Sequence, residues 1–151
     1  MKPYKSYQDT KVSVMESHEQ IVKILRKHGI FDTQMTNMES KSSIITRFPI
    51  QRDNGTASIR VEIKYKDGDQ KDARRMARVL YNWIKAKVVA IEAGLESFTE
   101  SFMPYIELPN GQTLSQQVLP QLPPDIDNIG LLELQGKPVK RLALTYREEE
   151  R

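Results

Sequence analysis

The sequence predicts an α+β domain in which a three- to four-stranded antiparallel sheet packs against one long helix, with smaller flanking helices. Two patterns indicate this fold class. Residues 42–50 and 57–65 alternate apolar and polar side chains with the period of two that distinguishes the faces of a strand. Residues 69–94 repeat apolar side chains at the 3.6-residue period of an amphipathic helix. Sheet and helix are therefore expected from separate stretches of one chain.

Length and composition limit the class of protein. A chain of 151 residues, 28% charged and 38% hydrophobic, is typical of one globular domain. The net charge is only +3, so the placement of the charges matters more than their sum. Cysteine is absent, which excludes disulfide scaffolds, thiol nucleophiles and cysteine metal sites. We expect a cytoplasmic protein (host cytoplasm if it is phage-encoded), because the chain has neither a signal peptide pattern nor the run of about 20 apolar residues that spans a membrane.

The N-terminal part is expected to contain a strand, a helix and a second strand. Residues 4–14 alternate in polarity, which predicts the first strand. Ser17 and Gln20 have the spacing of a capping box, and the helix that follows them can end at Gly29. Residues 31–38 are expected to form the second strand.

The two alternating segments are expected to pair as a hairpin. Asp53, Asn54 and Gly55 between them tolerate the positive φ angles that a tight hairpin turn requires. On the second of these strands, one set of alternate residues is apolar and predicts the core face: Ala57, Ile59, Val61, Ile63 and Tyr65.

The long helix is expected to begin at Asp69, whose carboxylate can cap it, and to end at Gly94 after about 36 Å. One arc of this helix is apolar, and Lys87 projects into its middle. The members of the apolar arc are Val79, Ala90, Trp83, Met76, Leu80, Ile91 and Ile84. We expect this arc to face the core.

Shorter elements are expected after the long helix. Phe98 and Phe102, one helical turn apart, are expected to continue the core. The segment 105–108 is a short extended piece, and Thr113 with Gln116 forms a capping box for another helix. Residues 1–122 are then a single domain. Residues 123–151 form a proline-led extension or hairpin, whose leucines suggest a homo-oligomer contact.

The opposite side of the long helix carries a basic stripe whose members occupy successive turns and can face a line of phosphates. Cations on the expected open face of the sheet add to this charge, Arg47 among them. The alternative is a plainly solvated helix face, the common outcome for a run of charges, or a face that contacts a protein partner. The candidate nucleic-acid-binding residues are Lys71, Arg74, Arg75, Arg78, Lys85, Arg60 and Lys64.

Lys87 has two interpretations. A desolvated lysine with a lowered pKa can act as a base or an anion ligand. A lysine that extends its amine to solvent or pairs with a carboxylate is the structural alternative, and Glu107 or Glu100 would be natural partners.

Several kinds of chemistry have no supporting motif. The sequence has no phosphate-binding glycine loop, dinucleotide fingerprint or nucleophile elbow. His18 and His28 lie ten residues apart, which is about 15 Å along a helix and too far for one shared metal ion. Base-specific reading on the sheet is not expected either, because Phe48 and Tyr65 fall on the core side. We expect no cofactor, no metal and no assigned catalytic residue.

Over Ser17–Gly94 the expected order of elements is helix, three strands, helix. In this order the chain resembles the double-stranded-RNA-binding domain, whose second helix opens with a basic cluster after a glycine-containing loop. Gly68, Lys71, Arg74 and Arg75 stand at the corresponding positions. The resemblance concerns the order of elements, so it implies a fold rather than a function.

A second resemblance rests on residues 83–87, the spacing Gly94-x-x-x-Phe98-x-x-x-Phe102, and residues 105–113. Together with Ser17–Gly29, these segments resemble small phage and prophage proteins that have no established activity. The resemblance implies accessory roles such as support of DNA replication or recombination, counter-defence or assembly.

Three functions follow in order of preference. The first is a non-catalytic nucleic-acid-associated accessory protein that binds the phosphate backbone through the basic helix face. The second is a homo-oligomeric interaction or counter-defence protein that sequesters a host protein or an anionic nucleotide. The third is an enzyme that uses Lys87 with a carboxylate.

Overall fold

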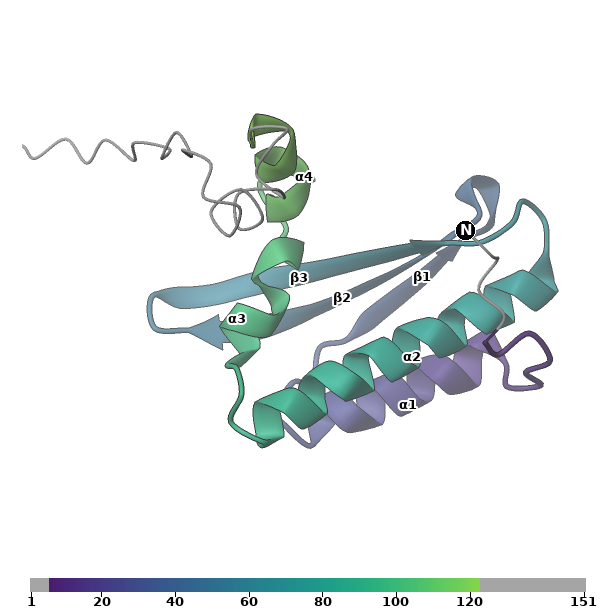
Figure 1. Cartoon of the computed structure of the whole chain (residues 1–151), viewed down its shortest axis with the longest axis horizontal. Coiled ribbons are helices and arrows are strands. Elements are labelled where there is room, and N and C mark those ends of the chain that lie inside the picture. Colours follow the sequence, from purple (N-terminus) through teal and green to yellow (C-terminus); the bar gives the residue numbers. More distant parts are fainter. Residues whose placement is uncertain (1–5, 123–151) are drawn as a thin grey trace, which may run out of the picture. The chain divides into compact units, whose positions relative to one another are not determined.

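The computed structural model describes residues 6–122 and confirms an α+β fold with a three-stranded antiparallel sheet (Figure 1). The chain divides into two compact units, Met1–Gln117 and Val118–Arg151. The extension or hairpin expected at 123–151, with its leucines, lies outside the described residues. The elements, in chain order, are α1 (Val14–Arg26), β1 (Gln34–Met38), the 3₁₀ helix η1 (Glu39–Lys41), β2 (Ser43–Arg52), β3 (Gly55–Lys64), α2 (Gln70–Glu92), α3 (Phe98–Phe102), η2 (Met103–Tyr105), α4 (Leu114–Val118) and η3 (Leu119–Gln121).

Helix α1 begins earlier than its sequence pattern suggested. Ser13 is the N-cap, and its side chain and that of Glu16 form a capping box with reciprocal bonds to each other's backbone N–H groups. Ser17, expected to be the cap, is instead fully buried inside the helix. The strand expected at residues 4–14 is therefore wrong, since its last residues are the cap and first turn of α1. The end of the helix is confirmed: Gly29 has a φ of +78°.

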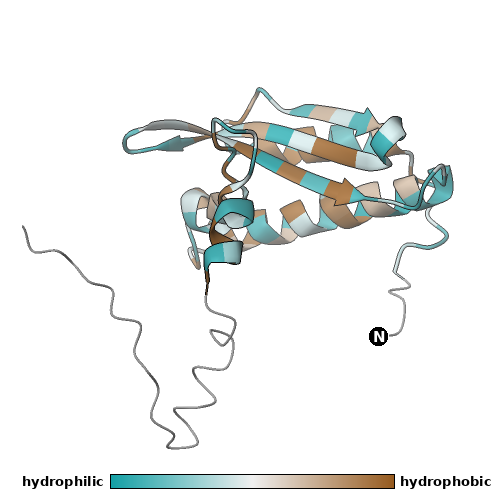
Figure 2. Ribbon diagram, turned by 90° about the horizontal axis from the view of Figure 1, so that it is seen from above, coloured by the Kyte–Doolittle hydropathy of each residue, from teal (hydrophilic) through white to brown (hydrophobic). Residues whose placement is uncertain are grey.

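The sheet has the strand order β1-β2-β3, and every neighbouring pair is antiparallel. The β2–β3 hairpin and its tight turn are confirmed, and Figure 2 shows the tip of this hairpin as hydrophilic. In the register of the hairpin, Phe48 lies opposite Ile59 on the core face, and Arg47 lies opposite Arg60 on the open face. The strand expected at 31–38 forms only from Gln34. The extended piece after η2 makes a single antiparallel bridge to β3, so within residues 6–122 the sheet does not gain a full fourth strand.

Helices α1 and α2 lie side by side on one face of the sheet and run in the same direction (Figure 1). Arg78 in the first half of α2 reaches Gln20 in the middle of α1. Glu92, the last residue of α2, contacts His28, which follows α1. The equivalent ends of the two helices therefore lie together.

Asp69 caps α2 as expected, through its carboxylate and the N–H groups of Lys71 and Asp72. The helix is rotated about its axis relative to the predicted apolar arc. Leu80 and Ile84 are buried as expected, whereas the other predicted members are only partly buried. Two small residues, Ala73 and Ala77, complete the buried face. The buried apolar residues of α2 are Ala73, Ala77, Leu80, Ile84 and Val88.

Phe102 anchors α3 to the rest of the core. Its ring is fully buried and contacts Phe48 edge-on, with 5.2 Å between the ring centroids, and Trp83 at 5.9 Å. The expectation that Phe98 and Phe102 continue the core is confirmed. The capping box between Thr113 and Gln116 at the start of α4 is also confirmed. No helix in residues 6–122 is both long enough and apolar enough to cross a membrane.

Candidate functional site

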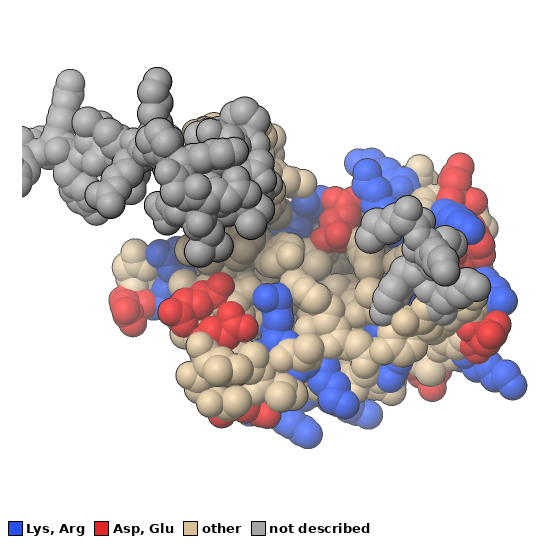
Figure 3. All heavy atoms as spheres, viewed as in Figure 1, with Lys and Arg blue, Asp and Glu red and all other residues tan. Residues whose placement is uncertain are grey.

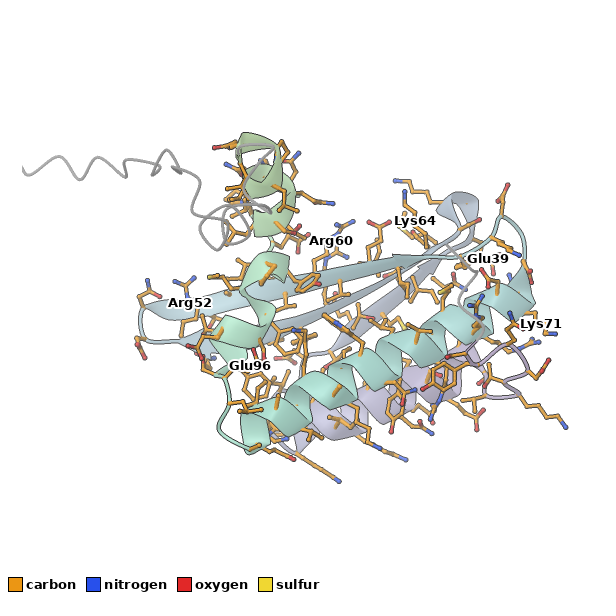
Figure 4. All side chains as sticks on the ribbon, in the orientation of Figure 1. Glu39, Arg52, Arg60, Lys64, Lys71 and Glu96 are labelled. Carbon is orange, nitrogen blue, oxygen red and sulfur yellow. The ribbon has the colours of Figure 1, made fainter. Side chains whose placement is uncertain are left out.

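The open face of the sheet carries two arginines that are internally neutralised. Arg47 binds Glu107 with its Nε 3.2 Å from Oε2 and its second terminal nitrogen 3.2 Å from Oε1. Arg60 lies 2.8 Å from Glu62 and 4.0 Å from Glu107, and only 14% of its side chain is exposed. The two positive charges are thus matched by two carboxylates. Lys64 is exposed on the same strand, and Figure 4 shows it near Arg60 on the side of β3 away from α2.

Two predicted site residues at the start of α2 face carboxylates. Lys71 lies 3.5 Å from Asp9, and both side chains are largely exposed. Arg75 lies 3.3 Å from Asp72, with 13% and 9% of the two side chains exposed, and its Nε donates to the carbonyl of Ser6. A largely buried pair of this kind orders the N-terminal end of α2 and leaves little net charge there.

The three other predicted site residues of α2 form no ion pair with a carboxylate in the part of the chain that the structure describes. Arg78 donates a hydrogen bond to the neutral Oε1 atom of Gln20, and its guanidinium lies 4.1 Å from the centroid of the Tyr81 ring. Lys85 is exposed, 6.0 Å from the same ring. Arg74 makes neither an ion pair nor a hydrogen bond within residues 6–122. These three charges are therefore uncompensated.

Helix α1 contributes two lysines to the same side of the molecule. Lys27 lines a groove of about 280 Å³ with Lys85 and Tyr81. Lys23 lies one turn earlier on the face of α1 that carries Lys27, since residues four apart are neighbours on a helix. Both lysines are exposed. Sequence reasoning missed them because it considered each helix alone, although their spacing of four was a usable signal.

Together these side chains form a band, here called the helical cation row: Arg74, Arg78 and Lys85 of α2, Lys23 of α1, and Lys27, the C-cap of α1. Among the ion pairs of residues 6–122, none includes a member of this row. At one end of the row, Glu92 pairs with His28 at 3.0 Å. In Figure 3, Lys and Arg side chains follow the margin where Figure 1 places α1 and α2, and acidic side chains are visible on the same margin.

Lys87 has a structural role in this fold. Its Nζ donates a 2.8 Å hydrogen bond to the carbonyl of Ser101 and lies 5.0 Å from the centroid of the Trp83 ring. The expected carboxylate partners are wrong. Glu100 caps α3 together with Ser97, and these hydrogen bonds lower the pKa of Glu100. Glu107 is held by Arg47 on the open face of the sheet.

The two histidines occupy different surroundings. His28 pairs with Glu92, and its ring packs against Phe98. His18 lies on the other side of α1, where burial lowers the pKa of its imidazole although the nearby Glu19 acts in the opposite direction. The part of the chain that the structure describes holds no cluster of three or more His, Asp or Glu side chains that could bind a metal ion.

Comparisons with protein-family models, with curated proteins and with solved structures find no match to this chain. The resemblances to phage proteins and to the double-stranded-RNA-binding domain remain predictions from the sequence. The function is therefore inferred from the charges and contacts described above.

Proposed function

We propose that this protein is a non-catalytic nucleic-acid-associated protein that binds the phosphate backbone through the helical cation row. One observation carries the proposal: five cationic side chains from two parallel helices lie on one side of the molecule, and none forms an ion pair within residues 6–122. Each lysine or arginine that contacts a phosphate releases a condensed counterion, and this release drives binding.

Internal pairing narrows the set of candidate residues. Arg60 and Arg75 already face carboxylates, so a phosphate would have to displace Glu62 or Asp72 to reach them. The unpaired members of the row need no such exchange. We therefore assign the main phosphate contacts to the row, with Lys71 and Lys64 as exposed outlying charges.

The proposed binding depends on charge and shape. The aromatic rings of Phe48 and Tyr65 are buried on the core face of the sheet, which leaves no stacking platform on the open face of β2 and β3. Phosphate contacts carry no sequence information directly. Affinity should therefore vary little with sequence and fall steeply with salt, with a slope of about −4.5 on a double-logarithmic plot for five phosphate contacts to duplex DNA.

The test is a titration of a fluorescent duplex oligonucleotide, followed by anisotropy at salt concentrations from about 50 to 200 mM. We expect the double variant Arg78→Glu, Lys85→Glu to bind at least about tenfold more weakly, with a salt slope shallower by about 2. The matched control is Arg52→Glu, Lys41→Glu, which changes the net charge equally. Both control residues are exposed and lie on β2 and η1, and Figure 4 shows Arg52 at the hairpin end of the sheet.

Two results would refute the proposal. The first is an absence of binding by the unaltered protein at the lowest salt concentration. The second is an equal loss of affinity in the two double variants, because net charge alone would then explain the binding. A selective loss in the Arg78, Lys85 variant supports the row as the site.

The other two functions expected from the sequence have less structural support. The amine of Lys87 is bonded to a backbone carbonyl, and no carboxylate lies within ion-pair distance of it among residues 6–122, so a Lys87–carboxylate enzyme has no assembled site there. The oligomer contact was assigned to residues 123–151, which lie outside the described part. A phage accessory role is compatible with the proposed phosphate binding, and we retain it as the proposed context.

A further inference from the structure

A hollow of about 420 Å³ lies between the first turn of α1, the strand β1 and the first turn of α2. This volume is within the usual range of small-molecule sites, about 300–1,000 Å³. Arg74 lines the hollow and is also a member of the helical cation row. The hollow therefore shares Arg74 with the proposed phosphate-binding surface.

Two methionines form much of the apolar lining. Met15 is 64% exposed although it is apolar, and Met35 faces the same space from β1. Thioether groups make favourable contacts with the edges and faces of aromatic rings, and their flexible side chains adapt to flat groups. Val14 adds a third apolar surface. This lining suits a planar ring better than a fully hydrated ion.

Polar groups line the same hollow and have hydrogen-bonding capacity to spare. Within residues 6–122, Arg74 and Gln70 make no side-chain hydrogen bond. The side-chain oxygen of Asn37 accepts a 2.9 Å hydrogen bond from the hydroxyl of Tyr65, which leaves its NH₂ group as a donor. An arginine suits a phosphate, and amide side chains suit the hydrogen-bonding edges of a base.

His18 lines the hollow with an uncharged ring. Burial lowers the pKa of its imidazole, so the ring is neutral at physiological pH. Its Nδ1 atom is buried and has no hydrogen-bond partner within the described part of the chain. The positive charge that lines the hollow therefore comes from Arg74, which places an anionic group at that end and leaves the methionine side for an apolar ring.

We propose that this hollow binds one nucleotide unit of a single-stranded nucleic acid, with the phosphate on Arg74 and the base between Met15 and Met35. The inference rests on the proposed function and goes beyond it, because it distinguishes single strands from duplexes. Bases inside a duplex are stacked and paired and cannot enter such a site, whereas those of a single strand are free to do so. The protein then prefers single strands to duplexes of equal length.

The first experiment follows backbone amide signals by NMR during titration with uridine 5′-monophosphate, adenosine 5′-monophosphate, uridine or inorganic phosphate. We expect the two nucleotides to shift signals of α1 residues 13–18, β1 and the first turn of α2. Inorganic phosphate should shift the signals of residues near Arg74 and leave the signals of Met15 and Met35 unchanged. Identical shifts from phosphate and nucleotides would overturn the assignment of a base site.

The second experiment compares a single-stranded oligonucleotide with a hairpin duplex, using Met15→Ala. Because Met15 is 64% exposed, its truncation should leave the fold intact. The matched control is Met103→Ala, another exposed methionine, located in η2. We expect Met15→Ala to weaken single-strand binding by about tenfold while duplex binding and the salt slope stay unchanged.

The outcomes separate this inference from the proposed function. Equal affinity for single strand and duplex, with Met15→Ala behaving like Met103→Ala, would overturn the base site and leave phosphate binding by the row intact. If neither oligonucleotide binds and no mononucleotide shifts the signals, both proposals fail.

Discussion

The open face of the sheet and the outer side of the α1–α2 pair both carry cations, and they differ in what those cations face. On the sheet, Arg47 and Arg60 are matched by Glu62 and Glu107. On the helices, the members of the helical cation row face water, an aromatic ring or the amide of Gln20. A polyanion is attracted by uncompensated positive charge. Arginines on the open face of the sheet therefore attract it less than the same residue type in the helical cation row.

The sheet arginines need their carboxylates for a local reason. Arg47 and Arg60 lie directly opposite each other on β2 and β3, where like charges destabilise the pairing. Glu107, 60 residues after Arg47, lies within ion-pair distance of both arginines. Its backbone N–H also donates to the carbonyl of Ser58 on β3. These sheet charges therefore join distant segments, whereas those of the row are left available to a ligand.

The largest change in stability and binding is expected when the sheet arginines lose a carboxylate partner and become uncompensated, like the cations of the helical cation row. Replacing Glu107 with Gln removes the charge that separates Arg47 from Arg60 and leaves Arg47 without its carboxylate. We expect the free energy of unfolding to fall by about 1–2 kcal/mol, because these groups are only partly exposed to solvent. Duplex DNA binding should strengthen, with a steeper salt slope. Urea unfolding and anisotropy measure the two effects.

Glu96→Gln is the control for Glu107→Gln. It makes the same change in net charge at a residue that takes part in no ion pair within the described residues. Figure 4 shows Glu96 apart from Arg60. If Glu107→Gln and Glu96→Gln have equal stability and equal salt slopes, the sheet carboxylate does not neutralise the arginines as described.

An intermediate effect is expected at Lys27, which tests the share of α1 in the helical cation row. Lys27→Glu should weaken duplex DNA binding about five- to tenfold and reduce the salt slope by about 1–2. The free energy of unfolding should change by less than about 0.5 kcal/mol, because this side chain is exposed. If Lys27→Glu binds duplex DNA with unchanged affinity, only the residues of the row on α2 contact the phosphates.

The smallest effect concerns the protonation of His18 on the other side of α1. Burial lowers the pKa of His18 in the folded protein below its ordinary value of 6.5. The unfolded chain then binds more protons near this pH, so the stabilisation is complete above about pH 6.5 and is lost as the pH falls toward the folded pKa. We expect His18→Gln to flatten the dependence of unfolding free energy on pH between about 5 and 7.5. Identical pH profiles for the two proteins would contradict this account.

The elements that could be predicted are those in which the hydrophobic period and the turn or cap residues indicate the same structure. The β2–β3 hairpin combines strict alternation with a turn at Asp53–Gly55, and α2 combines periodicity with the cap Asp69. The start of α1 lacked such agreement, because Ser13 with Glu16 and Ser17 with Gln20 both have the spacing of a capping box. The first pair places a carboxylate in the first turn, where it also complements the helix dipole.

The rotation of α2 and the composition of the site depend on contacts between distant segments. Ala73 and Ala77 add little to a hydrophobic pattern, but both are buried in the hydrophobic core. The stripe on α2 was visible because its members are close in sequence. The partners of these cations lie far from them in sequence. Asp9 pairs with Lys71, and Gln20 accepts a hydrogen bond from Arg78, and both partners come from segments that only the fold brings near α2.

The parallel course of α1 and α2 makes the two ends of this surface electrically unequal. The partial positive charges of both helix N-termini gather beside Arg74, and the partial negative charges of both C-termini gather near Glu92. The electric field of the helix ends therefore attracts anions at the end beside Arg74 and repels them at the end beside Glu92. A single small anion is expected to prefer the end beside Arg74 to the end beside Glu92.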